Sequence, residues 1–308
     1  LLLAASLAAL AAPTDDWNGF DLSGLAVPKA ALANGGQPRD GIPALDAPRF
    51  MAANEIALGF DERVVGVVVN GVARAYPRRI LIWHEVVNDR IGDQPFILVY
   101  SPLSGTVAAF ATKSAAVQDR FGVSGLLYNS STVVYDRASA SLWLPLEGRA
   151  IAGPRKGEQL APIEATETSW ADWLTRYPAT VLLSTQTGHQ RPYGQDPYAD
   201  YASNSELRFT VTARSARYHA KEPVLVISHN GQYRAYPFVE LARHDQPFTD
   251  QFAGATYRID FNYPDQRALV TDADGKPVPT ATEYWFAWHA GHPNEPVYSA
   301  PPAPPAGR

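Results

Sequence analysis

The sequence predicts a mainly β protein of the α+β class, with two related modules that each contain a β-hairpin and a short helix, joined by further short helices and long loops. Three observations support this prediction: a repeat within the chain, many short apolar runs bounded by turn residues, and a composition rich in apolar side chains. The chain has 308 residues, of which 46% are hydrophobic and 19% are charged. A chain of this length can bury a sizeable core without disulfides or metals.

The repeat appears when the chain is shifted by 160 residues, which aligns residues 64–85 with 224–245 and gives nine identities over 22 positions. Each copy begins with an apolar run and continues with an Asn-Gly pair, Asn70-Gly71 or Asn230-Gly231. Asn-Gly favours the tight turn of a β-hairpin, and the proline after the return strand is suited to open a helix. With a slip of two residues the match extends to another predicted strand in each copy, 96–100 and 257–261. We interpret the pattern as an internal duplication.

A central segment separates the two copies and contains mostly short predicted elements. Ser169 or Thr168 is suited to cap a helix over Trp170 to Tyr177, which Pro178 ends. Residues 187–204 are rich in Tyr, Pro, Gly and Asp and lack periodicity, so we expect a long loop. The predicted strands of this segment are 106–111, 125–128, 132–135 and 181–184.

We therefore expect a first module at 40–205, which includes the central segment, and a second module at 206–298. Residues 13–39 are predicted to be a linker, and the Pro-rich residues 299–308 a disordered tail.

The first residues, Leu1 to Ala12, are a Leu/Ala run with one serine. The run is too short to span a bilayer but fits the apolar part of a signal peptide, and Ala9-Leu10-Ala11 fits a cleavage site. No other stretch is apolar enough to predict a membrane span in the mature chain. The sequence thus predicts an exported protein, periplasmic or extracellular.

Charge and cysteine content exclude several classes of function. With 26 basic and 31 acidic residues and no block of like charges, the chain has no footprint for nucleic acid or anionic lipid. Because cysteine is absent, there is no disulfide, thiolate nucleophile, zinc finger or cysteine-held iron-sulfur cluster. We assign no cofactor and no metal ligands from the sequence.

Several short motifs are spread along the chain, at 40–43, 74–77, 83–89, 100–106, 121–130, 135–137, 141–143, 193–201, 284–288 and 292–293. Together they resemble the DUF3179 family of exported bacterial and archaeal proteins, which is named for having no assigned function. The family usually shows Cys-Pro-Leu-Cys-Gly-Thr where this chain has Ser101 to Thr106, so both cysteines are replaced by serine.

The serine replacements leave two interpretations of this loop open. Two thiolates at the Cys-x-x-Cys spacing beside a histidine are suited to a soft metal or to redox chemistry, and serine supports neither at neutral pH. Ser101 and Ser104 therefore mark either a degenerate site of this type or a simple turn cap.

His84 also has two interpretations. It is a candidate for chemistry together with Glu85 and Asp89. The equivalent histidine of the second copy, His244, instead favours a shared structural role, such as bonding the carbonyls at a helix end.

Two further groups extend the candidate site. Asp136-Arg137 and Arg74 are suited to a buried ion pair or an anion clamp. Aromatic residues such as Trp143 and Tyr198 fit either a ligand platform or the core. The candidate ligand-binding residues are His84, Glu85, Asp89, Ser101, Ser104, Asp136, Arg137, Trp143 and Tyr198.

The sequence favours an exported, non-enzymatic binding or scaffold protein with a degenerate site, whose partner is a small molecule or another extracytoplasmic component. The alternative is a metal-dependent, oxidoreductase-like enzyme that uses His84 and oxygen ligands. The sequence alone leaves open whether the protein is an enzyme.

Overall fold

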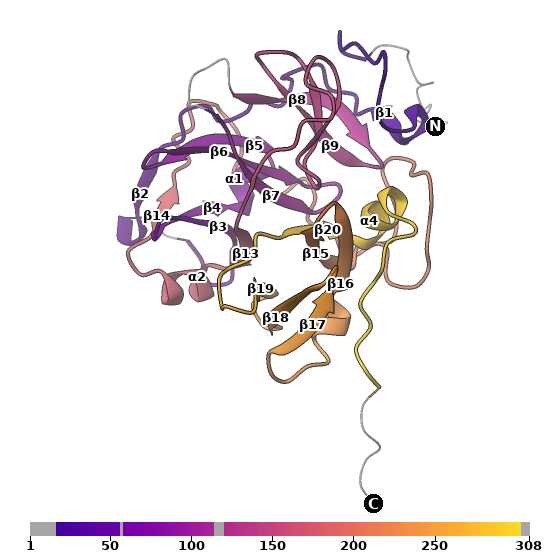
Figure 1. The fold of residues 1–308 in the computed structure, drawn as a ribbon. Helices are drawn as coiled ribbons and strands as arrows, with labels where there is room; N and C mark the ends of the chain where they lie inside the picture. The colour runs from indigo at the N-terminus through magenta and orange to yellow at the C-terminus, as the bar shows by residue number, and fades with distance from the viewer. Residues whose placement is uncertain (1–16, 56–57, 114–119, 303–308) are drawn as a thin grey trace, which may run out of the picture.

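The computed structural model describes residues 17–55, 58–113 and 120–302. The predicted signal segment and residues 303–308 of the predicted tail lie outside these ranges. Within them the chain is mainly β, with four sheets and four short α-helices, as the sequence predicts (Figure 1).

Both predicted hairpins and the helices that follow them are present. The Asn and Gly of each turn have positive φ angles, 50° and 79° in the first copy and 50° and 75° in the second. The registers also match, since Val64 pairs with Pro77 and Val224 with Pro237. The first copy comprises β3 (Arg63–Val69), β4 (Val72–Pro77) and α1 (Arg78–Leu81). The second comprises β15 (Pro223–His229), β16 (Gln232–Pro237) and α3 (Phe238–Leu241).

The two copies continue with the same order of elements. Each has a three-stranded meander, then a strand antiparallel to the first hairpin strand, a helix, and a segment parallel to the second hairpin strand. In the first copy these are β5 (Val86–Ile91), β6 (Gln94–Ser101), β7 (Thr106–Ala111), β13 (Ala165–Ser169), α2 (Trp170–Arg176) and β14 (Val181–Leu183). In the second they are β17 (Phe248–Phe252), β18 (Ala255–Asn262), β19 (Arg267–Thr271), β20 (Ala281–Tyr284), α4 (Trp285–Gly291) and a bridge at Val297. This order is what the duplication hypothesis requires.

The remaining strands belong to the first part of the chain. Residues 13–39, predicted to be a linker, contain a strand of a five-stranded sheet, and Phe20 is buried there, so this part of the prediction is wrong. Residues 187–204 form the predicted loop. The other strands are β1 (Leu32–Asn34), β2 (Phe50–Ala52), β8 (Phe121–Tyr128), β9 (Ser131–Asp136), β10 (Leu142–Leu144), β11 (Arg149–Ala152) and β12 (Pro162–Ile163). Two single-turn helices, η1 (Lys29–Ala31) and η2 (Ala53–Glu55), complete the described elements.

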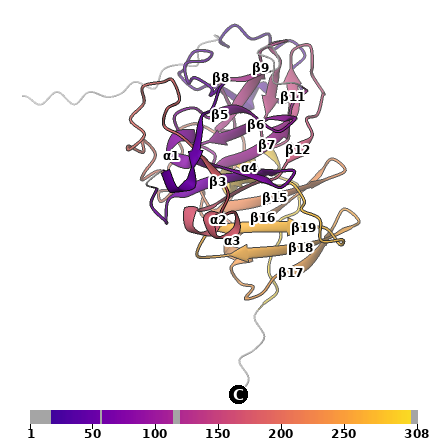
Figure 2. The same cartoon turned by 90° about the vertical axis from the view of Figure 1, so that its left-hand side faces the viewer.

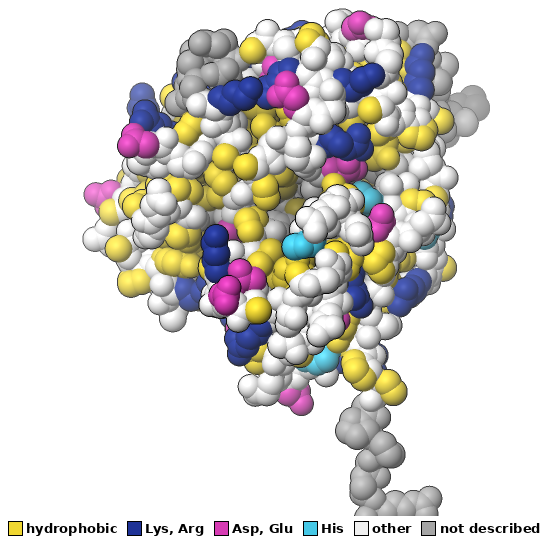
Figure 3. Space-filling view, viewed as in Figure 1, with side chains coloured by type: hydrophobic (Ala, Val, Ile, Leu, Met, Phe, Trp, Pro, Cys, Tyr) yellow, Lys and Arg dark blue, Asp and Glu magenta, His cyan; other side chains and the backbone are white. Residues whose placement is uncertain are grey.

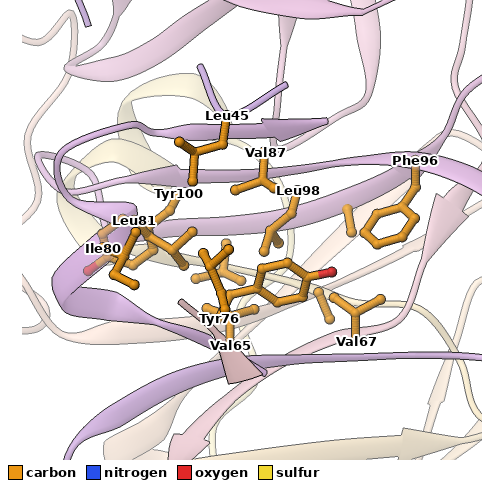
Figure 4. Packing of buried hydrophobic residues seen from close by; sticks show 14 of the residues in the cluster. Leu45, Val65, Val67, Tyr76, Ile80, Leu81, Val87, Phe96, Leu98 and Tyr100 are labelled. Atoms are coloured by element: carbon orange, nitrogen blue, oxygen red, sulfur yellow. The ribbon is translucent and has the colours of Figure 1, made fainter. Parts of the chain in front are cut away.

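The main core of the first copy lies between its hairpin sheet and its meander. Figure 4 shows the ring of Tyr76 from β4 between Leu98 on one side and Val65 on the other. All three side chains are fully buried. Because strands expose alternate side chains to opposite faces, the β-branched runs of both sheets supply this layer.

The two copies share one sheet, with the order β16-β15-β20-β7-β6-β5. Among the described residues, the ladder between β20 and β7 is a single residue pair, Thr282 with Val107, and a backbone hydrogen bond from Tyr284 to Ser104 lies next to it. In Figure 2 the strands of the second copy lie below those of the first.

Helices α2 and α4 each place two buried tryptophans against a hairpin. Ser169 caps α2 by accepting a hydrogen bond from the backbone N–H of Asp172, as predicted. The sequence does not predict helix α4, because Gly291 and Pro293 are typical of a segment that does not form a helix. Its tryptophans, Trp285 and Trp288, pack against the second hairpin and hold it in place.

The start of the predicted disordered tail is bonded to the second module. The backbone N–H of Ala300 donates to Glu240, and Arg243 donates to the carbonyl of Pro301. Ala300 is buried. The prediction of disorder from residue 299 is therefore wrong for its first residues.

We expect Gly66→Ala to lower the free energy of unfolding by about 2 kcal/mol or more, because overpacking a rigid core is costly. A Cβ atom at residue 66 would lie 2.0 Å from the buried ring of Trp173. Urea unfolding measures the change. Gly194→Ala is the control, because no atom lies within 4 Å of the Cβ it would add. Equal effects of the two substitutions would contradict this packing.

Candidate functional site

The turn between β6 and β7 holds Ser101 to Thr106, the loop that differs from the family pattern. Gly105 has a φ of 66°, and a Cβ atom there would lie 2.8 Å from the ring of Tyr284. The backbone N–H of Tyr284 donates to the carbonyl of Ser104 over 2.6 Å. The turn is thus held against β20 of the second copy.

Ser101 belongs to a hydrogen-bonded chain that ends at Glu85. Its Oγ accepts a hydrogen bond from the backbone N–H of Thr132. The Oγ1 of Thr132 lies 3.1 Å from that Oγ and 2.6 Å from Oε2 of Glu85. Glu85 is buried, with a φ of 58°, and forms no ion pair within the described residues. Burial raises its pKa to about 7, against the effect of the Thr132 hydrogen bond.

Ser104 belongs to a second chain, which ends at Glu283. Its Oγ lies 2.7 Å from Oγ1 of Thr106, which donates to Oε1 of Glu283 over 2.8 Å. Ser131 also donates to this oxygen. Burial raises the pKa of Glu283 to about 7, although both hydrogen bonds lower it. Each serine of the loop therefore extends the hydrogen bonding of one buried carboxyl.

Ser101 and Ser104 are completely buried, and their hydroxyls bond residues outside the turn backbone. The simple turn-cap interpretation does not describe either contact.

Both ring nitrogens of His84 have hydrogen-bond partners. Nδ1 lies 2.7 Å from the carbonyl of Pro43, and Nε2 lies 2.7 Å from the hydroxyl of Tyr193. Burial lowers the pKa of His84 to about 4, so its ring is neutral at pH 7. None of the hydrogen bonds of the described residues joins it to Ser101 or Ser104.

His244 has a different environment. Its Nε2 contacts the hydroxyl of Tyr298, and its ring stacks on Phe248. The expectation that His84 and His244 both bond helix-end carbonyls is wrong.

A cavity of about 560 Å³ lies beside the hydrogen-bonded series formed by Ser101, Thr132 and Glu85. Glu85 and Thr132 form part of its wall, together with Trp83 and Tyr198 from the predicted motifs. Apolar side chains cover much of the remainder: Ile42, Ile82, Leu103, Val123, Leu126, Leu127 and Phe209. The cavity is mainly apolar, with a few polar groups, as ligand pockets usually are.

The polar groups of this cavity are mostly hydrogen-bond donors. The indole Nε1 of Trp83 is buried and lacks a partner. Arg191 and Arg208 also line the cavity, and neither forms an ion pair within the described ranges, although Nη2 of Arg208 donates to the carbonyl of Pro197 over 3.1 Å. Arg208 stacks on Tyr198, with its guanidinium carbon 4.7 Å from the ring centre. The neutral form of Glu85 adds one more donor.

Asp89 lies in a structural triad. It accepts hydrogen bonds from Arg74 and from the hydroxyl of Tyr76. The second copy repeats this arrangement with Arg234, Tyr236 and Asp250. The repetition indicates that Asp89 ties the hairpin to the meander.

Asp136, Arg137 and Trp143 also lie away from the cavity. Asp136 accepts a hydrogen bond from Nε1 of Trp143, and Arg137 pairs with Asp46. Arg74 pairs with Asp89, so the suggested pairing of Arg74 with Asp136-Arg137 is wrong.

Sequence reasoning missed six residues that the structure brings to the site. Thr106, Ser131 and Thr132 bind the two carboxyls, and Glu283 comes from the second copy. Arg191 and Arg208 lie in or next to the long loop, where the Tyr-rich composition was the only available signal.

The described residues contain no cluster of three or more His, Cys, Asp or Glu side chains that could hold a metal ion. In the same part of the chain, no helix is long and apolar enough to cross a membrane.

Fold and site together define a mainly β protein of two similarly built modules, with a partly apolar cavity beside a buried carboxyl. The family model described as "Protein of unknown function (DUF3179)" matches residues 39–295, and the chain belongs to this family. Comparison with curated proteins and with solved structures found no match.

We expect Glu283→Gln to make the protein less sensitive to pH. In the folded state Glu283 holds its proton up to a pH of about 7, whereas an exposed glutamate releases it near 4.5. The folded state therefore loses stability as the pH rises from about 4.5 to about 7, by on the order of 3 kcal/mol from this residue. The variant should lose that much less over the same range, as measured by urea unfolding at several pH values.

Asp274→Asn is the control, because Asp274 lies exposed in a turn. Its pH dependence should equal that of the parent protein. An unchanged pH dependence in Glu283→Gln would show that Glu283 is ionised in the folded protein.

Proposed function

We propose that this protein is an exported, non-enzymatic binding protein whose small-molecule ligand occupies the cavity beside Glu85. One observation carries the proposal: a cavity of about 560 Å³ combines apolar walls with the unpaired indole N–H of Trp83 and two guanidinium groups that form no ion pair among the described residues. Donors without acceptors fit a ligand that has an apolar body and an anionic or acceptor-rich group.

We expect no nucleic-acid partner for this protein. On the face shown in Figure 3, basic, acidic and hydrophobic side chains are interspersed without a large area of one charge. The net charge of −5 also lacks the basic excess expected for such partners.

We infer that the loop from Ser101 to Thr106 is a degenerate form of a thiol site. In this protein the two serine hydroxyls belong to the hydrogen-bonded series that end at Glu85 and Glu283. A polar core has thus taken the place of a metal or redox centre.

The alternative is a metal-dependent, oxidoreductase-like enzyme based on His84. It has less support, because both nitrogens of His84 are occupied and the described residues contain no suitable cluster of ligands. Metal analysis of the purified protein distinguishes the two functions, since a stoichiometric metal would favour the enzyme.

We expect the double variant Arg191→Gln, Arg208→Gln to bind anilinonaphthalene sulfonate at least about tenfold more weakly than the parent protein. This probe has an apolar body and one anionic group, so it matches the walls and the two guanidinium groups. Fluorescence titration measures its affinity, and energy transfer from tryptophan reports its proximity to residues such as Trp83.

The control variant is Arg214→Gln, Arg258→Gln, which makes the same change in net charge at exposed positions outside the cavity. It should bind the probe as the parent does. Equal affinities of all three folded proteins would place the probe elsewhere and remove the support for this ligand site.

The degenerate-site inference predicts that Ser101→Cys with Ser104→Cys gains tight binding of Zn²⁺ or Cu⁺, since two thiolates suit these ions. Equilibrium dialysis with metal analysis measures the gain, and binding should weaken at low pH as the thiols protonate. Ser104→Cys alone is the matched control, because one thiolate cannot chelate an ion. A folded and reduced double variant that binds no metal would contradict the inference.

A further inference from the structure

A second and larger cavity, of about 800 Å³, lies between the two modules. Strand β13 of the first module and strands β19 and β20 of the second contribute walls, and these strands lie together in the centre of Figure 1. Tyr100 and Gly105, on either side of the Ser101–Ser104 segment, also line it. Leu103, between them, lines the Glu85 cavity instead, so the two cavities are separate.

Most charged groups of this inter-module cavity are already paired. Arg63 donates to the carbonyls of Asp265 and Gln266 and contacts Glu167. The ammonium group of Lys221 donates to the carbonyls of Asn204 and Glu206 and to the side chain of Asn204. Neither cation is therefore available to a ligand without breaking these contacts.

Arg78 differs from these cations. Its Nη1 lies 3.7 Å from Oε1 of Glu167, beyond hydrogen-bond distance, and it forms no hydrogen bond among the described residues. Its side chain retains 40% exposure. Glu167 is also in contact with Arg63, so its charge is shared between two guanidinium groups. The fork of Arg78 is thus free to bind a planar anion in bidentate geometry.

Tyr100 and Tyr284 line the same cavity. Tyr100 is only 5% exposed, and neither its hydroxyl nor that of Tyr284 takes part in a hydrogen bond within the part of the chain that the structure describes. Arg78 and both tyrosines line this one cavity. Among the described residues, three donor groups of this cavity therefore have no hydrogen-bond acceptor.

The rest of the cavity offers apolar surface. Leu225, Phe238 and Ala268 of the second module line it, and so does Phe60, a residue that is 71% exposed. A large exposed apolar side chain beside unpaired donors is typical of a binding site.

From this geometry we propose that the cavity between the modules is a second ligand site, which binds a small organic carboxylate. Arg78 holds the carboxylate group, the hydroxyls of Tyr100 and Tyr284 donate to its oxygens, and Phe60 with Phe238 contacts the apolar part. The site is independent of the proposed ligand of the Glu85 cavity, because the two cavities have different lining residues.

Isothermal titration calorimetry with benzoate tests the site, and uncharged benzamide is the matched ligand control. We expect benzoate to bind the parent protein, benzamide to bind at least about tenfold more weakly, and Arg78→Gln to weaken benzoate binding by about tenfold or more. Arg79→Gln is the control variant. Arg79 is the next residue along, pairs with Glu62, and does not line the cavity, so its replacement should leave binding unchanged.

Tyr284→Phe provides a second variant that keeps the ring packed on Gly105 and removes only the hydroxyl, and it should weaken benzoate binding about threefold or more. The variant Arg191→Gln, Arg208→Gln should bind benzoate as the parent does, because these residues line the other cavity. No binding of benzoate by the parent, equal binding of benzamide, or unchanged affinity in Arg78→Gln would each overturn the proposal. Loss of benzoate binding in the Arg191 and Arg208 variant alone would assign the ligand to the Glu85 cavity and overturn it as well.

Discussion

The junction between the modules depends on the burial and hydrogen bonding of the carboxyl group of Glu283. It is buried in β20 and accepts hydrogen bonds from Thr106 of β7 and Ser131 of β9. An ionised carboxylate without a basic partner is costly in such a place, so the pKa of the group is raised to about 7. Ser101 and Ser104 of the adjacent loop are completely buried. The same loop contacts the hydrogen bonds of both Glu85 and Glu283, so its packing affects both carboxyls.

The two modules share what holds them together and differ in what they offer to a ligand. Each ties its hairpin to its meander with an arginine, a tyrosine and an aspartate, and each anchors a helix with two tryptophans. The Glu85 cavity instead draws on segments without a counterpart in the second module, such as β8, β9 and the loop that carries Arg191. Functional differences are therefore concentrated in the segments that are not repeated.

Local signals account for what the sequence predicts well. The turn at Asn70-Gly71 and the cap at Ser169 are set by a few neighbouring residues, so the hairpins and α2 are predictable. Helix α4 has no side-chain cap and depends on the burial of its tryptophans, which no local pattern reveals. The residues of the candidate site also fall into those that a local pattern predicts and those that only the fold brings together. Glu85 and Tyr198 belong to recognisable motifs, whereas Glu283 reaches Thr106 from 177 positions away, and only the fold brings them together.

The single residue pair between β20 and β7 has a mechanical consequence. A sheet resists bending because neighbouring strands share several successive hydrogen bonds, and Thr282 with Val107 is the whole of this ladder. The backbone ladder is therefore much shorter here than in the hairpins on either side, and hydrogen bonds such as those of Glu283 and Arg63 supply much of the connection. A ligand in the cavity between the modules would contact both of them and so restrict their relative motion. Conversely, a change in the relative orientation of the modules would change the width of that cavity.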